Sequence, residues 1–342
     1  MKIAIIGAGI YGCHIGERLI SLGFEVKIYE KSNNIFSVAS GNNQYRLHLG
    51  FHYARNFRTR QQSRDGFFRF LERYGSFTKK IKNNYYLVPK GRSLIDFKTY
   101  KSIMMSSGLD FVDCVTPPWL IDSIDSILTD ERLIQVSELK KYFLDKLSGD
   151  IVFNKNVSVI NHANDKPVIC DEIYDYVIDC TWGHFSHQDK FFYEPTILLY
   201  YKCINPSFLD NAITLVDGEL LSLYPTENKD IFTLSSVRHT PIKTTSSSAE
   251  ANNIIKNYSK ENILEKRRLF EEEIIYFFPS FLDNFEYTGE QLSIKTKPFG
   301  NDDDRSCYVE FDSFDKRKIL CLSGKIDNLF YATSRILDLI KV

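Results

Sequence analysis

The chain has 342 residues, which fits about two domains and is long enough for a large buried core. It carries 43 Lys and Arg against 44 Asp and Glu, so its formal net charge is −1, which argues against a nucleic-acid binder relying on an overall basic surface. A hydrophobic fraction of 43% with a charged fraction of 25% excludes a disordered chain and is typical of a globular protein.

The first elements are a short strand, a glycine turn, a helix and a second strand. Residues 2–6 form an apolar run typical of a buried parallel strand, a helix is expected up to Gly23, and residues 24–29 form the second strand before Glu30. The glycines allow a tight turn and the close approach of a pyrophosphate, the helix N-terminus favours phosphate, and Glu30 can accept hydrogen bonds from a ribose. This unit predicts a dinucleotide site formed by Gly7, Ala8, Gly9, Ile10, Tyr11, Gly12, Glu30 and Lys31.

Helices and strands then alternate up to about residue 180. Residues 33–53 are rich in Asn, Ser and Gly and are expected to form a loop. The predicted elements that follow are a helix over 56–74, a strand over 85–88, a helix over 97–107, a strand over 133–136, a helix over 137–147, and strands over 151–153 and 176–180.

The character of the chain changes after residue 190. Alternating apolar and polar stretches over 198–204, 213–216, 220–224 and 231–237 predict an antiparallel sheet. A helix over 254–278, strands over 286–297 and 318–322, and a helix over 326–340 follow. The sequence thus predicts an α/β fold with a Rossmann-like domain over 1–80, 130–190 and 300–342, and an inserted domain with a mixed or antiparallel sheet over 81–129 and 191–299.

The loop after the second strand carries a more specific pattern. Residues 40–53 read Ser-Gly-Asn-Asn-Gln-Tyr-Arg-Leu-His-Leu-Gly-Phe-His-Tyr. The sequence resembles the FAD-dependent D-amino-acid oxidase superfamily, which includes glycine and sarcosine oxidases, glycerol-3-phosphate dehydrogenase and L-2-hydroxyglutarate oxidase. In the last two, a Ser-Gly-Asn-like stretch precedes a His-x-Gly-x-x-Tyr stretch like that of residues 48–53.

Three later segments extend the resemblance over nearly the whole chain. Residues 176–183 are similar to the family's second cofactor strand, and residues 156–159 lie where the family packs backbone on the adenine. Residues 322–326 resemble the C-terminal strand, glycine and helix beside the flavin, although relatives often have more glycine where Lys325-Ile326-Asp327 stands here. The resemblance implies a Rossmann-like FAD-binding domain of the glutathione-reductase type. It extends the cofactor site to Ser40, Asn43, Gln44, Arg46, Val157, Thr181, Trp182, Gly183, Ser323, Gly324, Lys325 and Ile326.

Four residues are candidates for the chemistry itself. The resemblance places His48 near the flavin, and histidine titrates near neutrality and could take a proton from the substrate. A helix N-terminus with Lys325 beside it would stabilise the negative charge of a reduced flavin. His239 is a second candidate base, and Arg305 could bind a carboxylate through two hydrogen bonds.

Substrate contacts are expected from the loop and from the inserted sheet, which in this superfamily covers the substrate side of the flavin. The residues concerned are His52, Tyr224 and Arg238. A metal site is not expected, because no His joins the acidic run at 302–304 at ligand spacing.

The expected function is that of an FAD-dependent oxidoreductase which transfers hydride from a small amine or amino acid to flavin N5. The first alternative is oxidation of a hydroxy acid, a polyol or a sugar-derived alcohol. The second is a non-redox flavoprotein that acts on a sugar nucleotide. A small-molecule substrate is the expected partner, without nucleic acid, and the oligomeric state and the electron acceptor stay open.

The expected compartment is the cytoplasm. The seven cysteines form no Cys-x-x-Cys pair, and their odd number does not suggest a disulfide framework. No apolar run approaches the about 18 residues needed to span a bilayer, and the N-terminal run shows no secretory cleavage pattern. We therefore also expect no membrane span.

Overall fold

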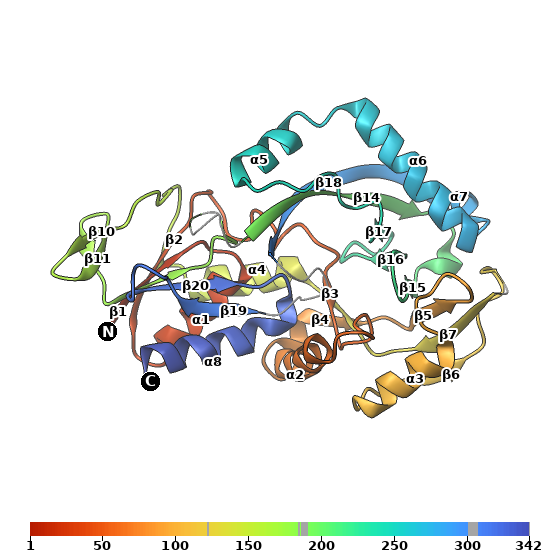
Figure 1. The fold of residues 1–342 in the computed structure, drawn as a ribbon, viewed down its shortest axis with the longest axis horizontal. Helices are drawn as coiled ribbons and strands as arrows, with labels where there is room; N and C mark the ends of the chain where they lie inside the picture. Colours follow the sequence, from red (N-terminus) through yellow and green to blue (C-terminus); the bar gives the residue numbers. More distant parts are fainter. Residues whose placement is uncertain (122, 184, 186–190, 300–306, 342) are drawn as a thin grey trace.

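The computed structural model describes residues 1–121, 123–183, 185, 191–299 and 307–341. Two large sheets dominate it (Figure 1). One carries the N-terminal and C-terminal segments, and the other is built from the middle of the chain. No helix in these ranges combines the length and the apolar character that crossing a lipid bilayer would require.

The first sheet has six strands in the order β19-β20-β13-β1-β2-β9. All neighbouring pairs are parallel except β19 with β20, which is antiparallel. The carboxyl ends of the parallel strands therefore meet at one edge of the sheet. The strands are β1 (Lys2–Ile6), β2 (Glu25–Tyr29), β9 (Ile151–Val152), β13 (Tyr176–Asp179), β19 (Tyr308–Phe311) and β20 (Lys318–Leu322).

Both faces of this sheet are covered, because alternate residues of a strand point to opposite sides. Ile3 and Ile5 of β1 pack into the core shared with the helices, whereas Ala4 and Ile6 pack with Tyr174 on the other side. The helices on the first side are α1 (Ile10–Ser21), α2 (Phe57–Tyr74), α4 (Val136–Lys146) and α8 (Leu329–Ile340). The second side packs against a small sheet of β10 (Asn161–Ala163), β11 (Lys166–Ile169) and β12 (Glu172–Ile173).

The second sheet has eight strands in the order β18-β14-β17-β16-β15-β5-β7-β6. Its pairs are antiparallel except β15 with β5. Its strands are β5 (Asn83–Pro89), β6 (Val112–Cys114), β7 (Ile124–Leu128), β14 (Phe191–Cys203), β15 (Asn211–Leu215), β16 (Leu221–Pro225), β17 (Ile231–Ser236) and β18 (Phe285–Pro298).

The odd-numbered residues 197–201 of β14 point away from the first sheet. Ile197, Leu199 and Tyr201 pack with Phe270 and Ile274 of the outer helices, which leaves the even-numbered residues facing inward. The outer helices are α5 (Ser248–Lys256), α6 (Lys260–Phe277) and α7 (Phe281–Asn284), and α3 (Phe97–Ser106) lies at the far end near β6 (Figure 1).

A short third sheet lies where the two parts of the chain meet. It consists of β3 (Arg46–Leu47), β8 (Arg132–Ile134) and β4 (Thr78–Lys80), in the order β3-β8-β4. The predicted domain boundaries near residues 80, 130, 190 and 300 fall between strands of different sheets, and the division into two domains stays a proposal.

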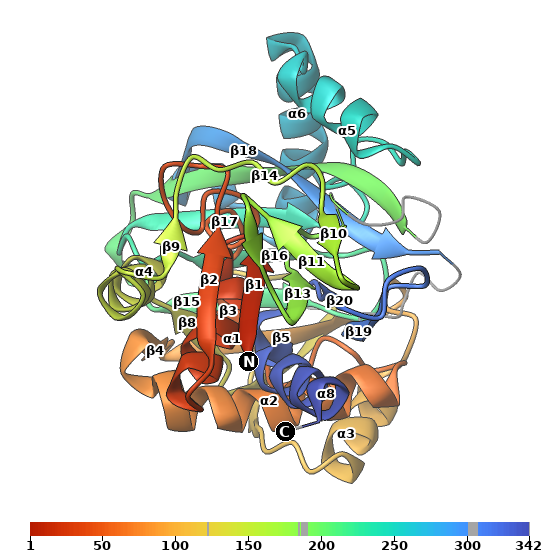
Figure 2. The ribbon, with the colours of Figure 1, turned by 90° about the vertical axis from the view of Figure 1, so that its left-hand side faces the viewer.

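Three predicted elements differ from the structure. The helix predicted over 254–278 is two helices, α5 and α6, because Ser259 caps a new helix by accepting a hydrogen bond from the Asn262 N–H (Figure 2). The strand predicted from 198 begins at Phe191, since it pairs with β18 along its whole length. The closing helix begins at Leu329, after a 3₁₀ turn over Ile326–Asn328.

Candidate functional site: a cavity between two sheets

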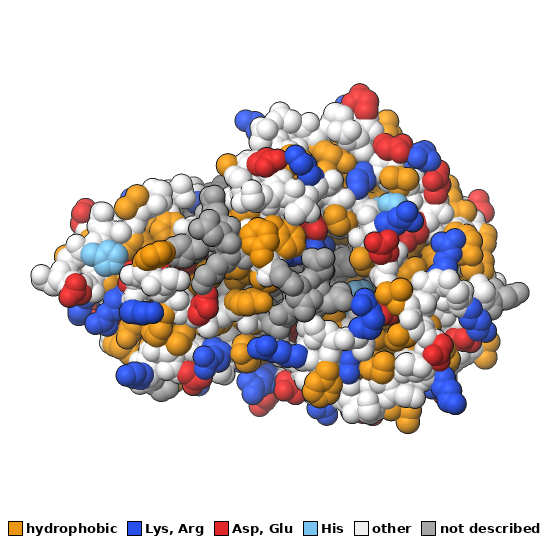
Figure 3. Space-filling model, in the orientation of Figure 1, with side chains coloured by type: hydrophobic (Ala, Val, Ile, Leu, Met, Phe, Trp, Pro, Cys, Tyr) orange, Lys and Arg blue, Asp and Glu red, His pale blue; other side chains and the backbone are white. Residues whose placement is uncertain are grey.

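A cavity of about 1480 Å³ lies between the carboxyl edge of the six-stranded sheet and the inner face of the eight-stranded sheet. It exceeds the roughly 300–1,000 Å³ typical of small-ligand pockets. Residues that directly follow four of the parallel strands line it: Gly7, Glu30, Cys180 and Ser323. On the face seen in Figure 3, acidic and basic side chains are interspersed, in keeping with the net charge near zero.

The glycine turn after β1 leaves no room for side chains. Gly7 has a φ of +99°, and a Cβ on Gly12 would lie 1.9 Å from the Gly7 carbonyl oxygen. The turn brings the N-terminus of α1 to the cavity, where the Ile10 N–H donates to Ser40 Oγ at 2.9 Å. Its backbone N–H groups and the helix dipole can receive phosphate oxygens, so the turn fits a dinucleotide.

Glu30 holds this turn as well as lining the cavity. One carboxylate oxygen accepts from the Ala8 N–H and the other from the Ser32 N–H, both at 2.8 Å. The carboxylate thus ties the glycine turn to the end of β2. Its predicted contact with a ribose stays a proposal.

The segment that follows β13, beside the glycine turn, contributes a buried hydrogen-bond donor. Trp182 lines the cavity after β13, and its indole N–H is buried and has no hydrogen-bond partner within the described ranges. Its carbonyl accepts from Thr296 Oγ1 at 2.8 Å, which ties this corner to β18. An unsatisfied buried donor is costly, so the corner fits a group that supplies an acceptor.

Lys325 lies at the C-terminal corner but is strongly engaged there. Its side chain is 4% exposed, its ammonium donates to Ser63 Oγ of α2, and it lies 3.6 Å from the centroid of the Tyr53 ring. Asp327 Oδ2 is 3.8 Å from the ammonium. The Lys325 ammonium therefore lies between α2 and the turn that follows β20. Its predicted stabilisation of a reduced flavin stays a proposal.

His48 follows β3 and lines the cavity together with His52. His48 Nδ1 lies 3.5 Å from Glu131 Oε2, and Glu131, just before β8, is fully buried. The Glu131 carboxylate also accepts from the Leu49 N–H at 2.8 Å and from the Tyr86 hydroxyl at 2.7 Å. The loop and the third sheet together therefore place a buried carboxylate beside an imidazole on the cavity wall.

The charge of Glu131 is maintained by its neighbours. Burial alone would raise the pKa of Glu131, but His48, Arg46 and the Tyr86 hydroxyl outweigh it and lower the pKa to about 2. Burial, followed by the charge of Glu131, raises the pKa of Tyr86 well above its usual value. Glu131 is thus an anion and Tyr86 a neutral donor across the physiological range.

Arg46 lies deeper than predicted. Its guanidinium stacks on the Tyr224 ring at 3.9 Å, and its Nε and one terminal nitrogen are buried without a hydrogen-bond partner among the residues placed by the structure. Tyr224 itself is fully buried. Arg46 therefore lines the cavity with the buried Tyr224 ring behind it.

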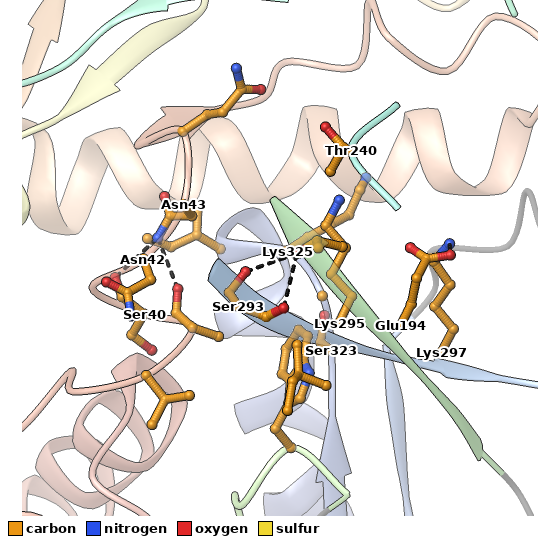
Figure 4. Close-up of a pocket in the computed structure, with 18 of the residues that line it drawn as sticks. Ser40, Asn42, Asn43, Glu194, Thr240, Ser293, Lys295, Lys297, Ser323 and Lys325 are labelled. Carbon is orange, nitrogen blue, oxygen red and sulfur yellow. Dashed lines mark hydrogen bonds and ion pairs between the residues drawn. The ribbon is translucent and has the colours of Figure 1, made fainter. Parts of the chain in front are cut away.

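The inner face of the eight-stranded sheet forms a polar roof, which we define as the cavity-lining side chains of β14 and β18. Thr196 pairs with Ser293 across the two strands, and their hydroxyl oxygens are 3.0 Å apart. Lys297 Nζ donates to Glu194 Oε1 at 2.9 Å. Figure 4 shows this ion pair on the opposite side of the cavity from Ser40, Asn42 and Asn43.

A charged pair lies at another part of the wall. The Arg55 side chain donates to the Asp217 carboxylate, and both residues line the cavity. The backbone N–H of Asp217 donates to Ser93 Oγ at 2.9 Å, which ties this wall to the turn after β5.

Most of the predicted cofactor residues lie on the cavity. Those that line it are Gly7, Gly9, Ile10, Tyr11, Glu30, Lys31, Ser40, Asn43, Gln44, Arg46, Val157, Thr181, Trp182, Ser323, Gly324, Lys325 and Ile326. Ala8, Gly12 and Gly183 support the turns from behind and are not in the lining. Asn43 uses its amide to hold its own loop, donating to the carbonyls of Ala39 and Ser40.

Three predicted substrate or catalytic residues lie away from the cavity lining. His239 faces α6, with Nε2 3.6 Å from Glu273 Oε2 and its ring 5.9 Å from that of Phe270, because the chain turns after β17. Arg238 is exposed, and Tyr224 is buried beneath Arg46. Arg305 lies outside the described residues.

The resemblance implied that the inserted sheet covers the substrate side, but the roof residues and Glu131 were not predicted. The alternation of β14 and β18 was visible, but which face is inward depends on the partner strands. Glu131 precedes a short apolar strand, and a lone acid at a strand end is a weak signal. Only the pairing of β3 with β8 brings it beside His48.

Comparisons with known proteins identify the relatives of this chain. A family model described as an NAD(P)-binding Rossmann-like domain matches residues 5–72. The FAD-dependent monooxygenase FPY4 of Fusarium mangiferae is 46% identical over 341 residues, which cover 99% of this chain and 91% of the relative.

Solved structures of oxidases share the fold at low sequence identity. Glycine oxidase from Geobacillus kaustophilus has a TM-score of 0.70 at 13% identity, covering 99% of this chain and 94% of that one. L-α-glycerophosphate oxidase from Mycoplasma pneumoniae, solved with FAD bound, has a TM-score of 0.73 at 12% identity, covering 100% and 94%. These matches confirm the fold expected from the D-amino-acid oxidase superfamily. The close similarity to FPY4 shows that the chain belongs to a family of FAD-dependent oxidoreductases.

Proposed function

We propose that this FAD-dependent oxidoreductase oxidises a small, hydroxyl-bearing substrate at an alcohol carbon, with His48 as the base. The observation that carries the proposal is an imidazole on the cavity wall, backed by the buried carboxylate of Glu131. An alcohol must lose its hydroxyl proton as it becomes a carbonyl, whereas a neutral amine needs no strong base.

The residues have separable roles in this proposal. The glycine turn, Ser40 and the Trp182 corner would hold FAD, and the bound cofactor would accept the hydrogen and electron pair that leave the alcohol carbon. His48 would take the hydroxyl proton at Nε2, since Nδ1 faces Glu131. The product is the carbonyl compound.

The roof supports a hydroxyl-bearing substrate. Thr196, Ser293 and Gln291 present hydroxyl and amide groups to the cavity, and these can both donate and accept hydrogen bonds. The roof cation Lys297 is already paired with Glu194.

An amine or amino-acid substrate, the leading expectation from the sequence, is a second candidate. The observation that favours it is Lys295, which lines the cavity from β18 and could hold a substrate carboxylate. The non-redox alternative, a flavoprotein that acts on a sugar nucleotide, is not favoured, because the chain belongs to a family of oxidoreductases.

Monooxygenation is a third candidate, supported by the printed name of FPY4, which is 46% identical to this chain. That chemistry inserts one atom of molecular oxygen into the substrate and consumes an external reductant. Oxidation of an alcohol, in contrast, reduces the cofactor without oxygen.

Anaerobic reduction separates the three candidates. The purified holoenzyme is mixed with panels of polyols and hydroxy acids, amino acids and amines, or NADH and NADPH, and the flavin absorption is followed. Bleaching by an alcohol panel supports the proposal, and bleaching by amines alone contradicts it. Bleaching by a nicotinamide alone, with substrate oxygenation in air, supports the monooxygenase.

A further inference from the structure

We propose that Glu131 is a positioning residue that holds His48 with its proton on Nδ1 and leaves Nε2 as the acceptor at the cavity. This inference rests on the proposed function, because it assigns a partner to the proposed base. Glu131 contacts the cofactor or substrate in no step of the proposal, and it acts only through His48.

Glu131 is itself fixed in place by two donors. The Leu49 N–H reaches Oε1 at 2.8 Å and the Tyr86 hydroxyl reaches Oε2 at 2.7 Å. Leu49 is the neighbour of His48 in the chain, so the carboxylate fixes the loop as well as the ring. Oε2 can accept a second hydrogen bond, and it lies 3.5 Å from His48 Nδ1.

The imidazole is oriented by the same contact. Its Nδ1 is buried, while the side chain as a whole is 23% exposed, so the exposed part lies elsewhere on the ring. A separation of 3.5 Å exceeds a normal hydrogen bond, and catalytic hydrogen bonds are often long before the ligand is bound. With Nδ1 directed at a carboxylate, Nε2 is the nitrogen left for the cavity.

The charges around the pair favour this arrangement. Arg46 from β3 and Tyr86 from β5 face Glu131 and hold it ionised, and Tyr100 of α3 and Tyr224 of β16 lie within its field. The rings of His52 and Tyr53 pack 5.9 and 5.8 Å from that of His48. An anion accepts from Nδ1–H and stabilises the imidazolium that forms when Nε2 takes a proton.

The test is nitrogen NMR of the holoenzyme with ¹⁵N-labelled histidine, without any substrate. The chain has seven histidines, and the His48 signals are assigned by their loss in His48→Gln. The proposal predicts that neutral His48 carries its proton on Nδ1 in the wild type. A wild-type spectrum with the proton on Nε2 would overturn it, and this outcome depends on no variant folding.

The Glu131→Gln variant sharpens the test. The Leu49 N–H requires the amide oxygen, so the amide NH₂ takes the place of Oε2. The Tyr86 hydroxyl, which donates to Oε2 in the wild type, then rotates to accept one amide hydrogen, and the other is donated to His48 Nδ1, which moves the proton to Nε2. An unchanged tautomer in this variant contradicts the proposal, and Glu131→Asp should restore part of the wild-type behaviour.

A matched control is Asp312→Asn. Asp312 is another buried carboxylate paired with a cation, 3.4 Å from Lys318 Nζ, but it lies outside the cavity lining. Its loss should leave the His48 spectrum unchanged. Because the readout needs no turnover, a failure of the alcohol proposal in the bleaching assay is distinguishable from a failure of the Glu131 proposal.

Discussion

The two large sheets meet the cavity in different ways. The six-stranded sheet presents an edge, where Gly7, Glu30, Cys180 and Ser323 each directly follow a parallel strand. The eight-stranded sheet presents a face, where every second side chain of β14 and β18 points inward. An edge is built from local turns, whereas a face depends on strand register and partners far away in the sequence.

The largest effect is expected from a change in the glycine turn at the edge of the six-stranded sheet. Replacing Gly12 by Ala places a methyl group 1.9 Å from the Gly7 carbonyl, so the turn must open and the helix N-terminus must move from the cavity. We expect the purified variant to have lost its flavin absorption. A matched control is Gly75→Ala at the end of α2, where a Cβ meets nothing within 4 Å and the backbone is right-handed helical.

The control should keep its flavin and change in stability by no more than about 1 kcal/mol, because Ala fits that conformation. Wild-type flavin content in Gly12→Ala would show that the edge tolerates a side chain, and the assigned role of the turn would be wrong.

The second prediction concerns His48, which lines the cavity between the edge of the six-stranded sheet and the face of the eight-stranded sheet. His48→Gln should retain the flavin but lose about 10²–10⁴-fold in kcat on the alcohol substrate, the range typical of a lost general base. His162→Gln is the control, since His162 lies outside the cavity lining and pairs with Asp315 at 3.0 Å. A His48 variant with kcat near the wild-type value would remove this residue from the chemistry.

The third prediction concerns the acid stability of the buried cluster. The pKa of Glu131 is lowered from 4.5 to about 2 in the folded chain. Such a carboxylate adds stability above its unfolded pKa, and the contribution, about 3 kcal/mol, is lost as the pH falls toward the folded value. The free energy of unfolding of the wild type should therefore fall toward that of Glu131→Gln between about pH 5 and pH 3.

Urea unfolding at several pH values measures this difference. A constant gap between the two proteins over that window would mean that Glu131 is not held as an anion by Arg46 and His48.

The smallest effect is expected for the ion pair on the inner face of the eight-stranded sheet. Lys297 and Glu194 are 18% and 8% exposed, so removing one partner leaves a charge that is partly buried. Lys297→Met and Glu194→Gln should each lower the free energy of unfolding by about 1 kcal/mol, with the double variant losing less than the sum. Additive losses in a double-mutant cycle would show that the roof pair is not coupled.

The difference between local turns and a sheet face also explains how much of the site could be predicted from the sequence. The turn at 7–12 was predictable in detail, because a strand, three glycines and an acid at the next strand end define a local geometry. The roof was not, since the start of β14 at Phe191 depends on its pairing with β18. His239 looked like a pocket residue from its strand, but the following turn directs it to α6.

Glu131 shows the same limit in a single side chain. Its importance arises from Arg46, His48 and Tyr86, which lie 85, 83 and 45 residues away in the chain and reach it only through the third sheet and β5. No local pattern of residues reports such a cluster.

The central claim is that the cavity holds FAD at its edge and presents an alcohol to His48 beneath the roof. Anaerobic titration of the wild type and His48→Gln holoenzymes with the hydroxylated panel tests it most directly. The account predicts flavin absorption in both proteins, with rapid bleaching by at least one alcohol in the wild type and much slower bleaching in the variant. Equal bleaching rates in the two proteins, or bleaching of the wild type by amines alone, would contradict it.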